Sequence, residues 1–328
     1  MVVQCGLCAG AQLRSRWLKR IDHQNTKLHG AREKEVKVAF EYELNPQTDN
    51  WMQDFFWDSW ADEVFMSQNI SASGGRETIK INRLVQEDAS DVRPYISAMT
   101  LTEAGHGDVI SIHRITNKLW IWVNWTHYDT DGTRHRNLVR SPWKSGTYTW
   151  NSKPPNIQIM PSFYPDTAVI QAKLDPLGKY IAYRISGNGE DEYELRSLTD
   201  VELNIDNVIH HLGPMPLTRA KATQLGWTDR WVFQGYASTI DKLWRFTGTG
   251  NGNNTDPGAV TEYHWSTGAE TRHNVAGADS GEPEGLMVAR FGTDRIKVLM
   301  GFVRHPVRQF MVHSLTYNLN LSELPQAN

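Results

Sequence analysis

Two stretches decide the fold: Trp51-Met52-Gln53-Asp54-Phe55-Phe56-Trp57-Asp58 and Trp231-Val232-Phe233-Gln234-Gly235-Tyr236-Ala237. Each is a short β-like run that a turn joins to a second run, at residues 63–68 and 242–246. Similar segments recur along the chain at intervals of roughly 50–65 residues. Repetition of this kind indicates a modular β architecture, in which function resides in loops and at the centre of the assembly.

The repeated segments form five units of three or four short strands each. They open near Trp51, Gly105, Ala168, Trp231 and Glu284. Three or four strands are the content of a propeller blade, so we predict an all-β fold, a five-bladed β-propeller over residues 46–320. A β-sandwich with long loops is the alternative, but it does not explain similar openings at a similar period. Residues 201–230, which are polar and contain proline, are interpreted as a connector between blades.

The two ends of the chain differ from this body. Residues 1–45 are interpreted as an amino-terminal arm for attachment or oligomerisation, and residues 321–328 as a short tail. Ala11 to Leu28 is polar and basic with apolar residues at a spacing of four, which predicts a helix. Residues 36–42 alternate strictly between apolar and polar, which predicts a half-buried strand.

Charge and composition narrow the function classes. With 39% hydrophobic and 22% charged residues the chain is typical of a globular protein. The net charge of −3 argues against nucleic acid as the main partner. Residues 1–35 carry seven Lys or Arg and three Asp or Glu, a net charge of +4, which leaves −7 for the remainder. A basic arm on an acidic body suggests separate tasks for the two parts.

Neither a membrane segment nor a secretion signal is expected. No apolar run approaches membrane-spanning length, and the short apolar start precedes the charges instead of following them. Cys5 and Cys8 form a C-x-x-C pair that no second pair completes. Together with His23 and His29 they could provide four zinc ligands, although their spacing matches no standard zinc finger. The alternative is that Cys5 and Cys8 are two ordinary thiols.

Three motifs carry potential chemistry. In Gly105-His106-Gly107-Asp108, the glycines let the backbone turn tightly and present His106 and Asp108 toward the axis, or else they form a plain turn. Glu282 and Glu284 are spaced to share one face of a strand, where they suit a cation, sugar hydroxyls or glycoside hydrolysis. Residues 129–132, Asp-Thr-Asp-Gly, lack the distal ligands of a calcium loop and read better as a turn. A structural calcium ion held between blades stays open, and no other cofactor is expected.

The repeated motifs, in their order and spacing along the chain, resemble those of a known protein family. Met52–Phe56, Val64–Gln68, Gly105–Gly107, Phe233–Tyr236 and Glu282–Leu286 resemble a family of five-bladed propellers over about residues 50–318. That family includes receptor-binding tail proteins of phages infecting Gram-positive bacteria, propellers from teichoic-acid loci and helveticin-type bacteriocins. Asp54 departs from it, because the family more often has glycine after the glutamine.

The resemblance implies a phage tail receptor-binding protein, located in the virion, that recognises host cell-wall polysaccharide or teichoic acid. The arm would then bind other tail proteins, and the protein would be a homo-oligomer, a trimer above all. The candidate glycan-binding residues, at the channel and in two loops, are Gln53, His106, Asp108, Gln234, Glu282 and Glu284, with Trp125 and Trp143.

Two alternatives stay open beside this binding role. One is a glycoside hydrolase or lyase that uses Glu282 and Glu284. The other is a helveticin-like secreted, extracellular bacteriocin. The resemblance favours binding over catalysis. The sequence also has no nucleophile elbow for a Ser-His-Asp enzyme and no phosphate-binding loop.

Overall fold

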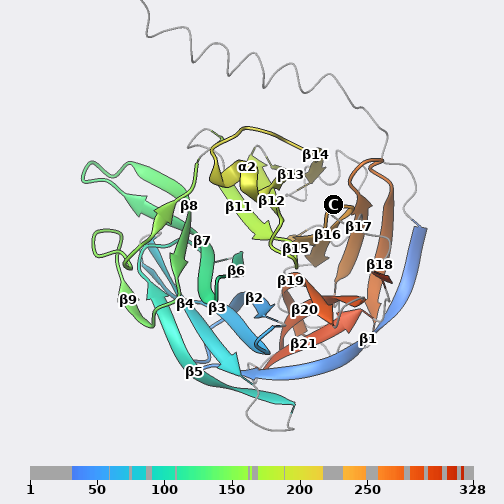
Figure 1. The fold of residues 1–328 in the computed structure, drawn as a ribbon. Coiled ribbons are helices and arrows are strands. Elements are labelled where there is room, and N and C mark those ends of the chain that lie inside the picture. The colour runs from blue at the N-terminus through green and yellow to red at the C-terminus, as the bar shows by residue number, and fades with distance from the viewer. Residues whose placement is uncertain are drawn as a thin grey trace, which may run out of the picture. The chain divides into compact units, whose positions relative to one another are not determined.

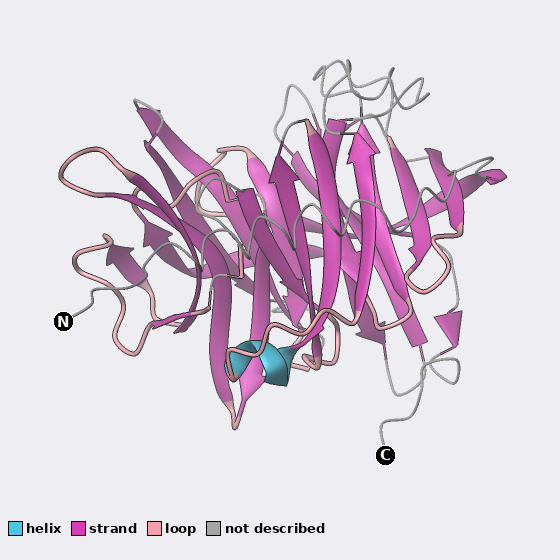
Figure 2. Ribbon diagram, turned by 90° about the horizontal axis from the view of Figure 1, so that it is seen from above, coloured by secondary structure: helices cyan, strands magenta, loops and turns pink. Residues whose placement is uncertain are grey.

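The computed structural model describes residues 32–320, apart from residues 59, 74–75, 86–90, 108, 162, 165–168, 188, 217–231, 249–257, 277–280, 292–294, 305–308 and 316–318. The predicted helix at 11–28, Cys5, Cys8, His23, His29, Asp108 and the tail 321–328 lie outside these residues. The unit from Arg32 onward consists almost entirely of strands (Figures 1 and 2).

Five sheets make up this unit, and four of them are built mainly from strands that follow one another in sequence. The first contains β2 (Met52–Asp58), β3 (Glu63–Ser73), β4 (Arg76–Val85) and β5 (Val92–Leu101), and the short β9 (Gly146–Tyr148) pairs parallel to β5. The second contains β6 (Ile110–Ile115), β7 (Lys118–Tyr128), β8 (Arg134–Pro142) and β10 (Gln158–Ile159). The third contains β11 (Val169–Leu174), β12 (Tyr180–Gly187), β13 (Glu190–Ser197) and β14 (His210–Pro216). The fourth contains β15 (Val232–Ser238), β16 (Lys242–Gly248), β17 (Ala259–His264) and β18 (Glu270–Ala276).

The fifth sheet joins the two ends of the chain. It contains β19 (Gly281–Phe291), β20 (Arg295–Arg304), β21 (Gln309–Leu315) and the short β22 (Leu319–Asn320). Its outer strand is the second half of β1 (Arg32–Asn45), antiparallel to β21. The first half of β1 runs parallel to β18, and its last residues run parallel to the start of β5. One amino-terminal strand therefore ties three neighbouring sheets together and closes the ring (Figure 1).

The innermost strands of the sheets are β2, β6, β11, β15 and β19. They are neighbours in this order around the centre, and β19 returns to β2. The prediction of an all-β five-bladed propeller is thus confirmed, with blades at the predicted units. Residues 32–45 differ from their predicted place in the arm: they are built into the ring by pairing with β18, β21 and β5.

The predicted connector at 201–230 is wrong for its described part. Residues 198–202 form the short helix α2 (Leu198–Glu202), which Ser197 caps by accepting a hydrogen bond from the backbone N–H of Asp200. Residues 210–216 form β14, the edge strand of the third blade. Two prolines and one glycine interrupt β14, and an edge strand tolerates prolines because one side of its backbone is not paired in the sheet.

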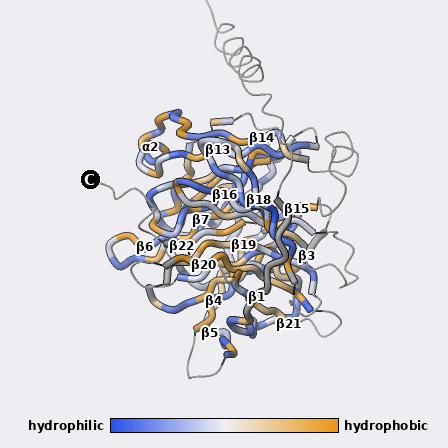
Figure 3. Tube along the Cα trace, turned by 90° about the vertical axis from the view of Figure 1, so that its right-hand side faces the viewer, coloured by the Kyte–Doolittle hydropathy of each residue, from blue (hydrophilic) through white to orange (hydrophobic). Residues whose placement is uncertain are grey.

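The apolar core lies between neighbouring blades. Four clusters of buried side chains fill the interfaces around the ring, and the apolar runs of β19 and β20 pass through its interior (Figure 3). Trp122, Trp125 and Trp244 are fully buried there. No helix among the described residues is long and apolar enough to cross a membrane.

Candidate functional site

The inner strands begin at one end of the ring, which we call the entrance. Contacts between neighbours join equivalent positions: Asp54 on β2 lies against Gly285 on β19, and Trp57 further along β2 reaches Met287 further along β19. The first residues of the inner strands therefore gather at the entrance. Most polar residues that the repeated motifs contribute lie here.

Three inner strands carry a β-bulge at the same place. The pairing register shifts around Gln53 in β2, around Gln234 in β15 and around Glu284 in β19. Because a bulge inserts an extra residue, it bends the strand and re-aims the next side chain. The residues that follow, Asp54, Gly235 and Gly285, come together at the centre.

Close packing at the centre explains the glycines of the repeated motif. A Cβ atom on Gly235 would stand 2.7 Å from the backbone nitrogen of Leu286. A Cβ on Gly285 would stand 2.7 Å from Asp54 Oδ1, and Gly285 also has φ +83°. The motif of Gln or Glu before a glycine therefore builds the ring, and Asp54 occupies the equivalent place in the first blade.

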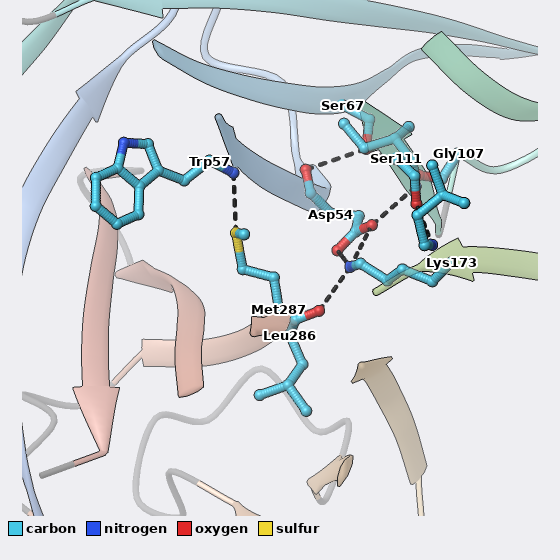
Figure 4. Close-up of polar contacts among 10 residues, drawn as sticks. Asp54, Trp57, Ser67, Gly107, Ser111, Lys173, Leu286 and Met287 are labelled. Atoms are coloured by element: carbon cyan, nitrogen blue, oxygen red, sulfur yellow. Dashed lines mark hydrogen bonds and ion pairs between the residues drawn. The ribbon is translucent and has the colours of Figure 1, made fainter. Parts of the chain in front are cut away.

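Asp54 forms a buried ion pair with Lys173 of β11 (Figure 4). Lys173 Nζ donates to Asp54 Oδ1 at 2.8 Å, to Oδ2 at 2.9 Å and to the Leu286 carbonyl at 2.6 Å. The Ile110 N–H of β6 donates to Asp54 Oδ2 at 2.8 Å. One ion pair thus links the inner strands of four blades, and its side chains fill the centre below the entrance.

Burial dominates the electrostatics of this pair. It raises the pKa of Asp54 to about 6 and lowers the pKa of Lys173, although each partner favours the charged form of the other. Both side chains are almost completely inaccessible to solvent. We assign the pair a structural role, because a ligand at the entrance cannot reach it without displacing the packed strands.

A rim of polar and aromatic side chains stands above the first blade at the entrance. It consists of Trp51, Asn69, Glu77 and His106, a set called the entrance rim below. His106 Nδ1 lies 2.7 Å from Glu77 Oε1 and 3.3 Å from Asn69 Nδ2, and the Asn69 N–H donates to the Trp51 carbonyl at 3.2 Å. The side chain of His106 is 51% exposed, and Trp51 is 36% exposed.

Backbone geometry presents His106 at this rim. The glycines on either side, Gly105 and Gly107, have φ values of +84° and +83°, which favour glycine. Ser67 Oγ donates to the Gly107 carbonyl at 2.8 Å, so the loop is tied to β3. His106 is therefore held at the surface of the first blade, beside β3 and β4.

A layer of ordered polar side chains supports the rim. Gln68 Nε2 donates to the carbonyls of Thr48 at 2.8 Å and Asn50 at 2.5 Å, and Asn82 Nδ2 donates to Gln68 Oε1 at 2.7 Å. These bonds fix the segment that leads to Trp51. A fixed rim loses little conformational entropy when it binds a ligand.

The predicted site residues divide into three groups. Gln53, Gln234, Glu282 and Glu284 lie half-buried on inner strands near the entrance, and His106 is exposed, in contact with Asn69 and Glu77 of the first blade. Glu284 lies within the bulge of β19, whereas Glu282 pairs with Val303 before it. Asp108 lies outside the described residues.

Of the two tryptophans predicted in loops, Trp125 lies in a strand and Trp143 lies in a loop. Trp125 belongs to β7 and is fully buried, with its indole N–H donating to the Thr102 carbonyl at 3.2 Å, so its ring is not accessible to a sugar. Trp143 follows β8 and is half-buried, packed edge to face on Phe65 at a centroid distance of 5.2 Å. The run of residues 119–125 has the pattern of a strand, and this pattern predicts the position of Trp125 better than its assignment to a loop.

Sequence reasoning missed the other rim residues. Trp51 opens the first unit and was read only as part of the repeat, although an aromatic residue just before an inner strand is suited to a rim. Asn69 and Glu77 lie on the middle strands β3 and β4, and only strand pairing brings them to His106. No local sequence signal marks those two residues.

Comparison with known proteins places this geometry in context. The model of the phage five-bladed β-propeller receptor-binding platform domain matches residues 51–286. The tail fibre of Staphylococcus aureus phage P68 aligns with a TM-score of 0.63 and 20% identity over 91% of this chain and 56% of that one. The chain thus spans little more than half of that fibre, and the likeness concerns the fold alone. A search of curated protein sequences gave no match.

Two carbohydrate-active enzymes resemble the chain more weakly. The α-L-arabinofuranosidase from Lactobacillus brevis aligns with a TM-score of 0.43 and 10% identity over 84% of this chain and 94% of that one. The GH43_1 enzyme from Xanthomonas citri, complexed with xylose, aligns with a TM-score of 0.44 and 9% identity over 86% and 90%. Neither likeness is strong enough to support an argument about this chain.

Proposed function

Because the chain belongs to the family of phage five-bladed β-propeller receptor-binding platform domains, we propose that it recognises sugar units of the host cell wall during adsorption. The sugars are bound at the entrance rim. The observation that carries this proposal is that the exposed Trp51 is joined through its carbonyl to the backbone of Asn69, whose side chain meets the exposed, Glu77-bound His106.

The chemistry of the rim suits a sugar. An exposed indole ring offers a flat apolar face to the C–H face of a pyranose, and a few placed polar groups fix its orientation. Glu77 accepts hydrogen bonds from hydroxyl groups, while Asn69 both donates and accepts. A carboxylate at this place repels a phosphate group, so the rim favours the sugars of a wall polysaccharide, or those carried by a teichoic acid, over the phosphate backbone.

The rest of the chain supports a role in a virion. Basic residues in the amino-terminal 31 positions are suited to attachment to other tail proteins, and the acidic body is then directed to the host. A symmetric oligomer, a trimer above all, would present several rims together. Several weak sugar contacts then give strong attachment through avidity.

Sedimentation with purified cell walls tests the proposal. Walls from a panel of Gram-positive bacteria are mixed with the full chain, and Trp51→Ala and His106→Ala are compared with Trp60→Ala and His211→Ala. Trp60 is the control for Trp51, because it is 75% exposed and follows the opposite end of β2. His211 is the control for His106, because it contacts Glu192 at 3.1 Å as His106 contacts Glu77.

We expect the wild type and both controls to sediment with at least one type of wall, and both rim variants to stay in solution. Loss of binding in Trp60→Ala alone would move the site to the opposite end of the ring. Release of soluble sugars from the walls would show that the protein is a hydrolase or lyase instead of a binding protein. Absence of binding to every wall in the panel would refute the proposal.

A further inference from the structure

A second cluster lies at the tip of the β7–β8 hairpin, in the second blade. His127 is in β7, His135 is in β8, and Asp129 is in the turn between them. One ligand atom from each residue, two imidazole nitrogens and a carboxylate oxygen, lies within 4.8 Å of the other two. We propose that these three residues bind a divalent transition-metal ion, Zn²⁺, with the remaining coordination position open to water or an external ligand.

Strand pairing explains why the two imidazoles meet. His127 and His135 are direct cross-strand partners in the antiparallel pair of β7 and β8. Opposite residues point to the same face of a sheet with Cβ atoms about 4.5–5.5 Å apart, which is within reach of one metal ion. The two rings are stacked with a centroid distance of 4.8 Å and an interplanar angle of 16°.

The turn brings the carboxylate to the same point. The Asp129 N–H donates to the Thr133 carbonyl, and the Gly132 N–H donates to the Asp129 carbonyl, each at 2.9 Å. Asp129 Oδ2 lies 2.8 Å from His135 Nε2, and Oδ1 lies 3.8 Å from His127 Nε2. Residues 129–132 thus form a turn, as the sequence indicates, and this turn also supplies a ligand.

The donor set selects the metal. Two imidazoles and a carboxylate suit borderline ions such as Zn²⁺, whereas Ca²⁺ requires six to eight oxygen ligands. Metal–ligand bonds of about 2.0–2.2 Å place tetrahedral donors about 3.4 Å apart. The observed separations from Asp129 of 2.8 and 3.8 Å lie on either side of that spacing, and all three donor atoms lie within 4.8 Å of one another. Three protein ligands leave one tetrahedral position open, and the Asp129 side chain, 54% exposed, makes the cluster accessible to solvent.

The surroundings of His127 hold its ring as metal ligands are usually held. Its Nδ1 lies 3.1 Å from Asn137 Nδ2; a flip of that amide turns the Asn137 carbonyl oxygen toward the ring, where it accepts from Nδ1–H and leaves Nε2 for the metal. One face of the ring stacks on Trp150 at a centroid distance of 4.0 Å and an angle of 3°. The imidazole is thus oriented by two neighbours before any ion binds.

Calorimetric titration of the metal-free full chain with Zn²⁺ tests the proposal. All proteins carry Cys5→Ser and Cys8→Ser, so that the thiols contribute no zinc binding. Asp129→Asn and His135→Gln remove a ligand with little change in shape. His211→Gln is the matched control, because His211 pairs with one carboxylate, that of Glu192, at 3.1 Å and belongs to no three-residue cluster among the described residues.

We expect one Zn²⁺ per chain in the Cys-free parent and in His211→Gln. The affinity for Zn²⁺ should fall by at least about tenfold in each ligand variant. Mutation of a residue that only hydrogen-bonds to a metal ligand already lowers metal affinity by about that factor. Binding should weaken in acid, because protons compete with the metal ion for its ligands. Lack of stoichiometric binding in the parent, or equal affinity in Asp129→Asn and His135→Gln, would overturn the proposal. Wall sedimentation without zinc reports on the entrance rim independently.

Discussion

Replacing Lys173 by Met tests whether the buried ion pair organises the centre of the ring. Methionine keeps most of the side-chain volume and removes the ammonium, which makes three hydrogen bonds to Asp54 and Leu286. The Asp54 carboxylate, 0% exposed, then keeps the backbone N–H groups of Ile110 and Phe55 as its donors in the described part of the chain.

The expected loss of stability is about 3–5 kcal/mol at neutral pH, the usual cost of leaving one charge of a buried pair uncompensated. At about 2–4 °C per kcal/mol this is a decrease in melting temperature on the order of 10 °C. The double variant Asp54→Asn with Lys173→Met should recover most of the loss, because an amide can accept from Ile110 and donate to the Leu286 carbonyl.

The pH dependence supplies a second readout. Burial raises the pKa of Asp54 to about 6 even with Lys173 present, and removing the ammonium raises it further. The folded variant therefore binds a proton that the unfolded chain releases, so its stability falls as pH rises from about 4 to beyond 6. The difference from the wild type should be smaller at pH 5 than at pH 7.5.

Urea unfolding at both pH values, followed by tryptophan fluorescence, measures these differences. A single variant within about 1 kcal/mol of the wild type would refute the structural role of the pair. So would a double variant as unstable as the single one.

Three further changes test the ring itself. Deleting residues 1–31 should leave the melting temperature nearly unchanged, whereas deleting residues 1–44 should prevent folding, because β1 then no longer pairs with the edges of three blades. Equal melting curves for the two deletions would contradict closure of the ring by β1. Gly285→Ala should cost about 2–4 kcal/mol in urea unfolding, since its Cβ meets Asp54 and its φ is +83°, and an unaffected midpoint would count against close packing at the centre. Trp125→Ala should cost about 3–5 kcal/mol without changing the affinity of the folded fraction for walls, and a selective loss of affinity would restore Trp125 as a binding residue.

Strand content and blade number could be predicted because both depend on local patterns. Alternation in residues 36–42 correctly predicts a strand. The partners of that strand are β18, β21 and β5, and the first two of them lie more than 200 residues away in the sequence. The sequence therefore could not indicate that this strand closes the ring. The prolines of β14 led to the wrong prediction of a connector, because proline usually indicates a segment outside a sheet, whereas β14 is an edge strand.

The site was less predictable than the fold. Gln53 and Gln234 were identified by repetition, and the structure relates that repetition to bulges that let the central residues pack. A repeated motif reports what several blades share, whereas a binding site is made once. The entrance rim depends on Asn69 and Glu77 from two middle strands, and the His127–His135 pair depends on cross-strand register.

A crystal structure of the full chain with a bound wall fragment tests the central claim most directly. The fragment should be the smallest sugar that releases the protein from sedimented walls. We predict that one sugar ring lies on the Trp51 indole and that its hydroxyl groups bond to His106, Glu77 or Asn69. A sugar bound at the opposite end of the ring, beside Trp60, would contradict recognition at the entrance.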